Sequence, residues 1–459
     1  MPSETVDEVG PRARADDESR PSDRPVRQLG LFDAVCIMVG IVIGVGIYES
    51  PPRVAANVSG PTSLLLVWAL GGILAFVGAL CYAELATAYP RSGGDYVYLT
   101  RAYGSWVGFL YGWAELLVIR TGSIAAMAFV FSDYMTRLAP LGPRSPVVYA
   151  AIIVTLLSLV NVLGVREGKW TQNALTVAKV LGLSAIALIG LLSPFDGGPQ
   201  RASAAASSGS FALAMIFVLW TYGGWNENAY VAAEVKDPEP NIPRSLLLGT
   251  GLVTLIYVGI NWVFLYGLGF DKLRSSQAAA ADLLAAPFGD VGARLMVIFV
   301  AVSALGAVNG QIFTGARIGY ALGRDHPVMS RLGVWSPRFG TPAWALVLQA
   351  IITLLLIAGF GTRDGFETLV KYTAAVFWFF FLLTGVSLFV LRWKDRDRAR
   401  PYPVVAYPLI PLLFCLSSAY MLYGSLSYAP VESLWGGAIV LSGLPLYWFS
   451  ARTVRERRT

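Results

Sequence analysis

Long apolar runs, separated by short polar breaks, make up most of the chain. A transmembrane helix needs about 20 mostly apolar residues, and the breaks hold the glycine, proline and charged residues typical of loops, as at Pro238, Glu239 and Pro240. Twelve runs are long enough, at 31–55, 62–88, 104–134, 147–165, 172–193, 211–234, 246–269, 292–322, 341–360, 366–391, 405–427 and 433–451. The pattern predicts an all-α polytopic membrane protein with twelve transmembrane helices.

The composition agrees with this interpretation. The chain is 55% hydrophobic and 14% charged, whereas about 25% charged residues is usual for a soluble domain. A soluble enzyme, a disordered protein and a disulfide scaffold are therefore excluded. Most of the 35 Lys and Arg residues lie in the two tails and in the loops on the same side as the tails. This bias predicts a plasma (cytoplasmic) membrane protein with both termini in the cytoplasm, and it explains the basic net charge of +6 without a nucleic acid partner.

The order of the runs suggests four regions. Residues 1–28 are rich in charged residues and proline, which predicts a disordered cytoplasmic tail. Helices 1–5 would occupy 29–193 and helices 6–10 would occupy 211–392. Residues 393–459 would hold the last two helices and a basic cytoplasmic tail.

Two runs contain a cluster of glycines in their middle. The first run carries Gly40, Gly44 and Gly46, and the sixth carries Gly223 and Gly224. Runs one and six occupy corresponding positions in two five-helix halves, and an odd number of helices inverts the second half relative to the first. Paired glycine-interrupted helices in such positions indicate a transporter binding site. The alternative is that the glycines allow close helix packing, as in a GxxxG pair.

The chemistry of a broken helix favours a zwitterionic ligand. Unwound backbone is tolerated in a membrane only where it lines a cavity. The N-terminus of a half-helix carries partial positive charge and binds a carboxylate, while freed carbonyls at a C-terminus bind an ammonium group. A site with both ends suits an amino acid.

Four sequence motifs occur in order along the chain. They are Gly44-Val45-Gly46-Ile47-Tyr48-Glu49-Ser50-Pro51; Tyr82-Ala83-Glu84-Leu85 with Pro90-Arg91-Ser92-Gly93-Gly94-Asp95-Tyr96; Tyr222-Gly223-Gly224-Trp225-Asn226 with Glu234 and Asn241-Ile242-Pro243; and Asn309-Gly310 with Arg317 and Arg324-Asp325. Over about residues 28–395 the chain thereby resembles the amino acid–polyamine–organocation superfamily and, more narrowly, the L-amino acid transporter family and its bacterial permeases. Val45 stands where the family usually has serine, so only the backbone role is expected there.

The resemblance implies a leucine-transporter-like fold, with helices 1–5 and 6–10 as inverted repeats followed by two further helices. It also implies a role for Lys179, which lies in the middle of the fifth run. The ammonium group would stand where sodium-coupled relatives hold a cation, so transport would be independent of sodium. Two alternatives stay open: a lysine that only ties the fifth helix to carbonyls of the first, and a buried lysine that exchanges protons.

The candidate site residues come from the two breaks and from helix seven. Tyr257 and Asn261 match a Y-x-x-x-N motif of the family and either face the site or serve only in packing, and Trp220 matches an aromatic lid of the family, with ordinary packing as the alternative. The roles of Glu115, Arg120 and Glu227 stay open; Glu115 and Arg120 are five residues apart and are expected to point in different directions. The expected substrate-binding residues are Ile43, Gly44, Val45, Gly46, Ile47, Trp220, Thr221, Tyr222, Gly223 and Asn226, with Lys179, Tyr257 and Asn261 in coupling or structural roles.

These observations predict a secondary transporter that moves neutral L-amino acids by alternating access, without sodium and by exchange. The alternatives are a proton-coupled symporter, a polyamine or cationic amino acid carrier, and an amino acid sensor on the same fold. An enzyme is not expected, because the single histidine, His326, lies in a polar loop. No cofactor or metal is expected. The loop at about 135–146 holds no cysteine, which argues against a disulfide-linked glycoprotein partner.

Overall fold

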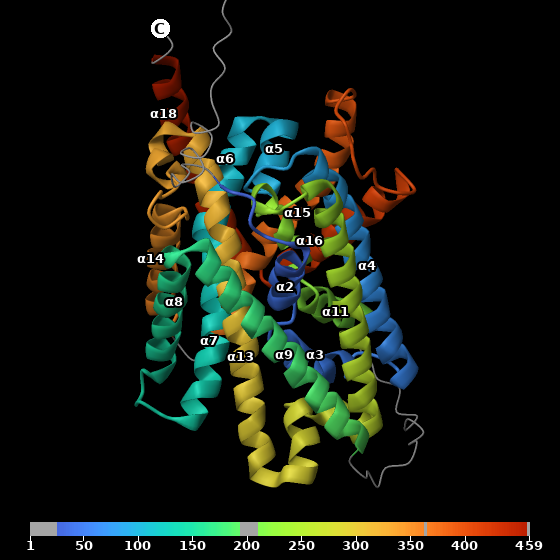
Figure 1. The fold of residues 1–459 in the computed structure, drawn as a ribbon. Helices are drawn as coiled ribbons and strands as arrows, with labels where there is room; N and C mark the ends of the chain where they lie inside the picture. The colour runs from blue at the N-terminus through green and yellow to red at the C-terminus, as the bar shows by residue number, and fades with distance from the viewer. Residues whose placement is uncertain (1–24, 193–209, 362–364, 457–459) are drawn as a thin grey trace, which may run out of the picture.

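The computed structural model describes residues 25–192, 210–361 and 365–456. Most of the tail predicted to be disordered, the loop at about 194–210 and the last residues of the basic tail lie outside the described residues. In the part that is described, regular structure is helical apart from two isolated β-bridges, Leu29 with Val235 and Ser336 with Thr341 (Figure 1). The protein is thus an all-α polytopic membrane protein, as predicted.

Nine of the described helices are long and apolar enough to cross a membrane. A tenth candidate is the pair α2 (Leu31–Val42) and α3 (Gly46–Ala55), which is bent by 47°. Shorter apolar helices, α10 (Phe211–Thr221) and α14 (Ala343–Gly359), occupy two further predicted runs. The nine are α4 (Pro61–Ala88), α6 to α7 (Ser105–Leu138), α8 (Ser145–Leu163), α9 (Val165–Leu192), α11 (Pro238–Leu268), the Pro287–Asp325 part of α13 (Ala279–Asp325), α15 (Gly365–Lys394), α16 (Leu409–Tyr428) and α17 to α18 (Pro430–Ala451). All twelve predicted runs contain helix, while the count of twelve membrane crossings stays a prediction.

The two interrupted helices lie in the centre of the bundle. In Figure 1, α2 and α3 are surrounded by the longer helices, with α13 and α11 on either side. Helix α2 packs against α9, α11 and α13, and α10 packs against α3 and α4. The long helices therefore shield the exposed backbone of the breaks from lipid, which such backbone requires.

Both predicted breaks are present. Helix α2 ends at Val42 and α3 begins at Gly46. Helix α10 ends at Thr221, and the chain continues through two 3₁₀ turns, η2 (Trp225–Ala229) and η3 (Ala232–Glu234). Gly224 has a φ of 102°, a left-handed conformation that glycine adopts without the steric cost of a Cβ atom. The glycine at this position therefore permits the second break.

A third irregularity lies inside the third predicted run. Between α6 (Ser105–Ala114) and α7 (Arg120–Leu138), the segment η1 (Glu115–Ile119) is a single π-helical turn. Such turns occur frequently at functional sites. The remaining elements are short: α5 (Asp95–Tyr103), α12 (Phe270–Ser275) and η4 (Pro327–Gly333).

Candidate functional site

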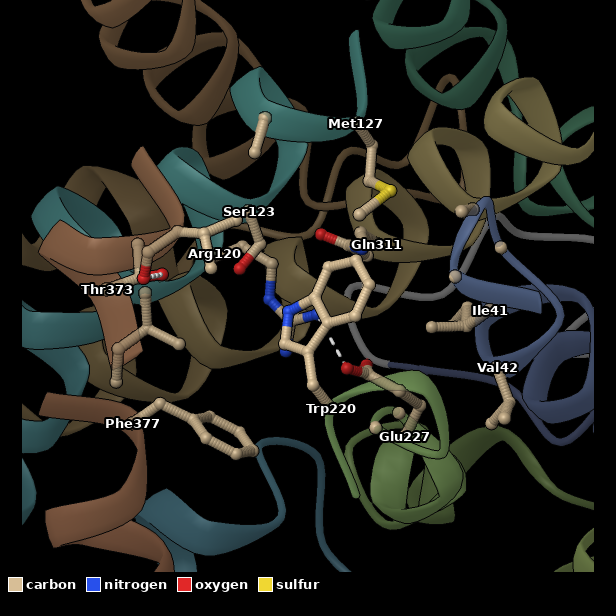
Figure 2. A pocket seen from close by; sticks show the side chains of 18 of the residues that line it. Ile41, Val42, Arg120, Ser123, Met127, Trp220, Glu227, Gln311, Thr373 and Phe377 are labelled. Atoms are coloured by element: carbon tan, nitrogen blue, oxygen red, sulfur yellow. Dashed lines mark hydrogen bonds and ion pairs between the residues drawn. The ribbon is translucent and has the colours of Figure 1, made fainter. Parts of the chain in front are cut away.

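A cavity of about 170 Å³ lies where the two breaks meet (Figure 2). The first break contributes Gly44, Val45 and Gly46 to its wall. Helix α7 and helices α13 and α15 close the other sides, with Ser123, Met127, Gln311, Thr373, Phe377 and Trp378 among the lining residues. The second break contributes Leu219, Trp220, Thr221, Gly223, Gly224, Asn226, Glu227 and Tyr230.

Helix ends of opposite polarity face this cavity. Helix α3 starts at Gly46, and the first N–H groups of a helix have no partner within it. Helix α10 stops at Thr221, where the last two carbonyls lack i→i+4 partners; that of Trp220 accepts from the Gly223 N–H at 3.0 Å and that of Thr221 from the Tyr257 hydroxyl at 3.2 Å. The macrodipole makes the first end partly positive and the second partly negative. One cavity thus offers a place for an anion and a place for a cation.

Gly46 allows the two breaks to touch. A Cβ atom at this position would lie 2.9 Å from Thr221 Cγ2 and 3.1 Å from Trp220 Cζ3. The two glycines of the GxxxG pair have different roles. A Cβ atom on Gly40 would lie 2.1 Å from Thr176 Oγ1 of α9, whereas Gly44 lines the cavity. Close packing therefore explains Gly40, and the cavity explains Gly44.

Trp220 lies across the cavity, with its ring directed toward α7 and α13 (Figure 2). The side chain is half-buried and packs edge-on against Phe366 of α15, with 6.0 Å between the ring centroids. Phe377 and Trp378 of α15 add apolar wall beside it. The indole thus covers a mostly apolar chamber at the end of α10.

Lys179 is buried next to the first break, with 1% of its surface exposed. Its Nζ atom donates to the carbonyls of Gly40 at 2.6 Å, Ile43 at 2.8 Å and Ser303 at 3.0 Å. An ammonium group has three donors, so all of them are used by backbone oxygens. A Cβ atom at Gly306 would lie 2.6 Å from Nζ, so the glycine gives the ammonium room.

Tyr257 joins the two breaks from behind the cavity. Its hydroxyl lies 2.7 Å from the carbonyl of Val42 and 3.2 Å from that of Thr221, the last residues of α2 and α10. Asn261 Nδ2 donates to the carbonyl of Tyr257 on the same helix at 2.8 Å. Neither side chain lines the cavity. A hydroxyl that binds two helix ends fixes the cavity's shape without contacting its contents.

The structure separates the ten expected substrate-binding residues into two groups. Ile43, Ile47 and Tyr222 are buried behind the cavity wall, and the Tyr222 hydroxyl donates to the carbonyl of Trp68 at 3.1 Å. The remaining seven line the cavity: Gly44, Val45, Gly46, Trp220, Thr221, Gly223 and Asn226.

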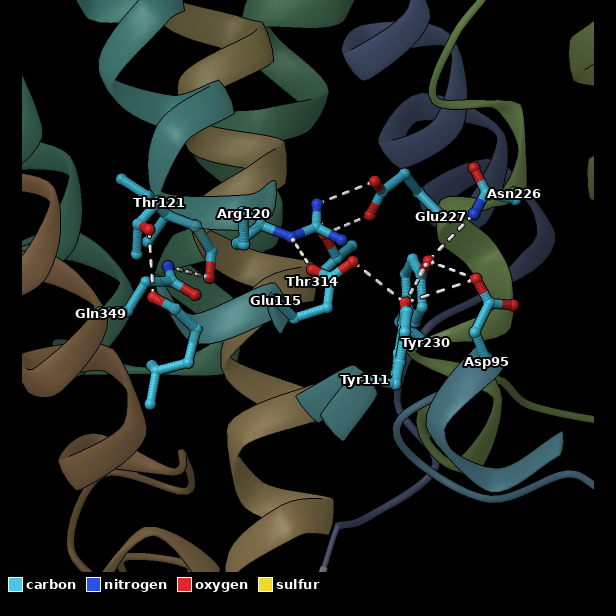
Figure 3. Close-up of polar contacts among 12 residues, drawn as sticks. Asp95, Tyr111, Glu115, Arg120, Thr121, Asn226, Glu227, Tyr230, Thr314 and Gln349 are labelled. Carbon is cyan, nitrogen blue, oxygen red and sulfur yellow. Dashed lines mark hydrogen bonds and ion pairs between the residues drawn. The ribbon is translucent and has the colours of Figure 1, made fainter. Parts of the chain in front are cut away.

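A buried charged cluster forms one wall of the cavity (Figure 3). Arg120 Nε lies 3.2 Å from Glu115 Oε2, and Arg120 Nη1 lies 2.8 Å from Glu227 Oε1. The expectation that Glu115 and Arg120 point apart is wrong. The intervening turn is π-helical, and its i→i+5 hydrogen bonding places residues five apart on one face.

Hydroxyl groups complete this cluster. Thr314 of α13 donates to Glu227 Oε2 at 2.6 Å, and Tyr111 of α6 donates to Glu115 Oε1 at 3.0 Å. The guanidinium of Arg120 also lies over the ring of Tyr230, 5.2 Å from its centroid. The sequence does not predict this cluster, because its members come from five elements, α6, η1, α7, η2 and α13, and a single π-helical turn leaves no signal in hydrophobic periodicity.

Two other buried ion pairs lie away from the cavity. Glu84 binds Arg392 and, at 3.1 Å, Arg400. Arg317 binds Glu234 at 2.8 Å, and both side chains are fully buried. Both residues belong to the sequence motifs described above, and the first pair links α4 to the C-terminal end of α15.

Comparison with known proteins assigns the family. The model of the family described as amino acid permease matches residues 29–449. The b(0,+)-type amino acid transporter 1 of Rattus norvegicus is 34% identical, over 96% of this chain and 93% of its own length. The large neutral amino acids transporter small subunit 2 of Mus musculus is 36% identical, over 92% of this chain and 80% of its own. The chain therefore belongs to the amino acid permease family, as a multi-pass amino acid transporter and not an enzyme.

Proposed function

We propose that the protein exchanges neutral L-amino acids across the plasma membrane by alternating access, without sodium. The observation that carries this proposal is the meeting of a helix N-terminus and a helix C-terminus at one cavity of about 170 Å³. An amino acid carries both charges that such a site accommodates. The relatives named above as an amino acid transporter and a large neutral amino acids transporter support the substrate class.

The two ends of the substrate would bind backbone groups. The N–H groups of Val45, Gly46 and Ile47 would hold the carboxylate at the start of α3. The carbonyls of Trp220 and Thr221 would hold the ammonium at the end of α10; each already accepts one neutral donor, from Gly223 N–H and the Tyr257 hydroxyl, and keeps a second lone pair. The carbonyl of Ile43 already accepts from Lys179, so it contributes less to the ammonium than the sequence suggested.

The rest of the cavity would receive an uncharged side chain. Two carboxylates line it, Glu115 and Glu227, and both are bound to Arg120. Because the guanidinium already occupies them, a cationic substrate side chain would have to break an existing ion pair. Phe377, Trp378 and Met127 offer apolar surface instead, and Trp220 would close over the substrate and exclude water.

Sodium independence rests on Lys179. The carbonyls of Gly40 in α2, Ile43 in the first break and Ser303 in α13 converge on its ammonium group at 2.6–3.0 Å. Converging carbonyls at the end of a broken helix are the groups that coordinate Na⁺ in transporters of this architecture. Here a covalently attached cation occupies them, and we propose that it replaces the coupling ion.

The remaining features of the proposal concern the membrane and partners. We propose the plasma membrane, both termini in the cytoplasm, and helices 1–5 and 6–10 as inverted halves followed by two helices. All three cysteines, Cys36, Cys81 and Cys415, are free and buried, which supports the absence of a disulfide-linked partner.

Counterflow in proteoliposomes tests the function. Vesicles loaded with unlabelled leucine should accumulate labelled neutral amino acids faster than empty vesicles, and labelled lysine should enter slowly. Gly46→Val should lower this uptake at least about tenfold, because the added side chain would overlap Thr221 and Trp220. The matched control is Gly251→Val on exposed surface of α11, where a Cβ atom meets nothing within 4 Å. Normal uptake by Gly46→Val would show that the site is elsewhere.

A further inference from the structure

The charged cluster beside the cavity continues into a third buried carboxyl group. Asp95, at the start of α5, is 2% exposed. Its Oδ2 atom accepts from the Tyr230 hydroxyl at 2.9 Å and lies 3.4 Å from the Tyr111 hydroxyl. Those two hydroxyls are 3.1 Å apart, and Tyr111 also reaches Glu115. A hydrogen-bonded chain thus runs from Asp95 to the ion pairs on the cavity wall (Figure 3).

The local backbone holds Asp95 against this chain. Gly94 has a φ of 49°, and a Cβ atom there would lie 2.5 Å from Tyr230 Cδ1. Only glycine therefore lets the start of α5 approach the Tyr230 ring. Asn226, which lines the cavity, donates to the same Tyr230 hydroxyl at 3.0 Å. The second break is thus linked to Asp95 through one hydroxyl group.

The charges in this network do not balance. Asp95, Glu115 and Glu227 are three buried carboxyl groups, and Arg120 is the one basic residue that binds any of them among the described residues. Arg120 contacts both glutamates, whereas no described basic side chain forms an ion pair with Asp95. An unpaired buried charge costs several kcal/mol, so the group farthest from the cation is the one that gains most from neutralisation.

The hydrogen bonds of Asp95 favour a neutral carboxyl group. Among the described residues, the buried Oδ1 atom has no hydrogen bond of normal geometry, although the Tyr82 hydroxyl of α4 lies close enough to Asp95 to interact with it. An ionised carboxylate needs donors at both oxygens, whereas a protonated one itself supplies a donor. Asp95 also lies behind the Tyr230 and Tyr111 hydroxyls and outside the cavity wall. A proton can reach it along this chain, but a cationic substrate in the cavity cannot.

We propose that Asp95 is a proton-binding site whose occupancy is linked to amino acid binding in the cavity. Uptake adds one proton to a carboxylate oxygen, and no other bond is made or broken. The Tyr230 and Tyr111 hydroxyls then turn from Asp95 toward each other and Glu115, which changes the bonds around Arg120 and Asn226. Loss of negative charge beside the cavity favours the substrate carboxylate, so binding tightens as the site gains its proton. This inference rests on the proposed function.

The surroundings of Asp95 place its titration near neutral pH. Helix α5 lies outside the helices long enough to cross the membrane, and burial raises the pKa of Asp95 to about 7. For a pKa of about 7 the protonated fraction falls about tenfold between pH 6 and pH 8. The titratable and charged groups around it are Tyr82 of α4, Tyr98 of α5, Tyr111 of α6, Glu115 of η1, Glu227 of η2 and Tyr230, with Arg120 of α7 bound to the two glutamates.

The test is leucine counterflow at equal pH on both sides of the membrane, measured from pH 6 to pH 8. The half-saturating leucine concentration of the wild type should rise several-fold over this range. Asp95→Asn, which mimics the protonated form, should exchange leucine with a flat profile. The matched control is Asp325→Asn, an exposed acid whose carboxylate accepts from Tyr96 at 3.0 Å, and it should keep the wild-type profile.

A second measurement keeps the inference testable if Asp95→Asn is inactive. Titration calorimetry of leucine binding to the detergent-purified wild type, in two buffers of different ionisation heat, counts the protons taken up. Uptake of a fraction of a proton near pH 7 supports the inference. The inference would be overturned if leucine binding took up no protons, or if the half-saturating leucine concentration of the wild type did not change with pH. It would also be overturned if Asp95→Asn kept the pH dependence of the wild type, or if Asp95→Asn altered lysine transport and left the pH dependence of leucine exchange unchanged. Leucine counterflow that persists in any of these cases leaves the proposed function intact.

Discussion

Two buried cations lie close to the cavity, Lys179 beside the first break and Arg120 on the cavity wall, and the protein stabilises them in opposite ways. Lys179 is surrounded by three backbone carbonyls, which supply dipoles and no net charge. Arg120 lies between the carboxylates of Glu115 and Glu227, and a third carboxyl group, Asp95, follows along the same chain of hydrogen bonds. The first site has an excess of positive charge, and the second has an excess of negative charge.

The difference determines what each site can exchange. The ammonium of Lys179 uses all three donors on fixed backbone oxygens, so it leaves no place for another cation. The Arg120 cluster has more carboxyl groups than cations, and it therefore has capacity for a proton. We infer that Lys179 makes the carrier independent of sodium, while the Arg120 cluster makes it sensitive to pH.

Removal of the cation at the first site should have the largest effect. Lys179→Met leaves three buried carbonyls without their donor, at about 1–3 kcal/mol each. We expect leucine counterflow to fall at least about tenfold and the unfolding temperature in detergent to drop strongly. Lys371→Met is the matched control, because Lys371 forms an i,i+4 pair with the exposed Glu367. Wild-type transport by Lys179→Met would reduce Lys179 to a helix-packing role.

At the second site, removal of the cation should lower the unfolding free energy more than removal of either carboxylate. Arg120→Gln leaves two buried carboxylates unpaired and should cost about 3–5 kcal/mol of unfolding free energy. Glu227→Gln leaves Arg120 bound to Glu115, so the loss should be about 1–2 kcal/mol. Thermal unfolding in detergent at pH 8 measures both changes. Equal losses from the two substitutions would contradict the excess of negative charge.

The smallest effect is expected at an exposed ion pair. Glu367 is 61% exposed and binds Lys371 one helical turn away. Solvent and salt screen such pairs, so Glu367→Gln should change the unfolding free energy by less than about 0.5 kcal/mol. If Glu367→Gln lowered the unfolding free energy as much as Glu227→Gln, thermal unfolding would not distinguish buried from exposed charge in this protein.

The same two cations show how much of the site the sequence predicts. Lys179 stands out because its run is otherwise apolar, and its bonds go to the glycine break that hydrophobic pattern also reveals. The glycine clusters likewise predict both breaks, with Gly44, Gly46 and Gly223 on the cavity wall. A backbone site made by one interruption in a regular pattern can therefore be found from the sequence alone.

The Arg120 cluster could not be predicted in this way. Glu115 and Arg120 meet only because of a π-helical turn, and the hydrophobic pattern of the run is compatible with a regular α-helix. Glu227 and Asp95 join them through tertiary packing of η2 and α5. Tyr257 shows the same limit, since the motif marks the residue but not the two carbonyls that it binds.

The central claim is that Lys179 permanently occupies the place of a coupling cation. It is tested most directly by leucine counterflow into proteoliposomes in sodium chloride and in choline chloride at the same pH and ionic strength. We predict equal initial rates and equal half-saturating leucine concentrations in the two salts. A wild-type rate that requires sodium, or that rises in proportion to it, would contradict the account.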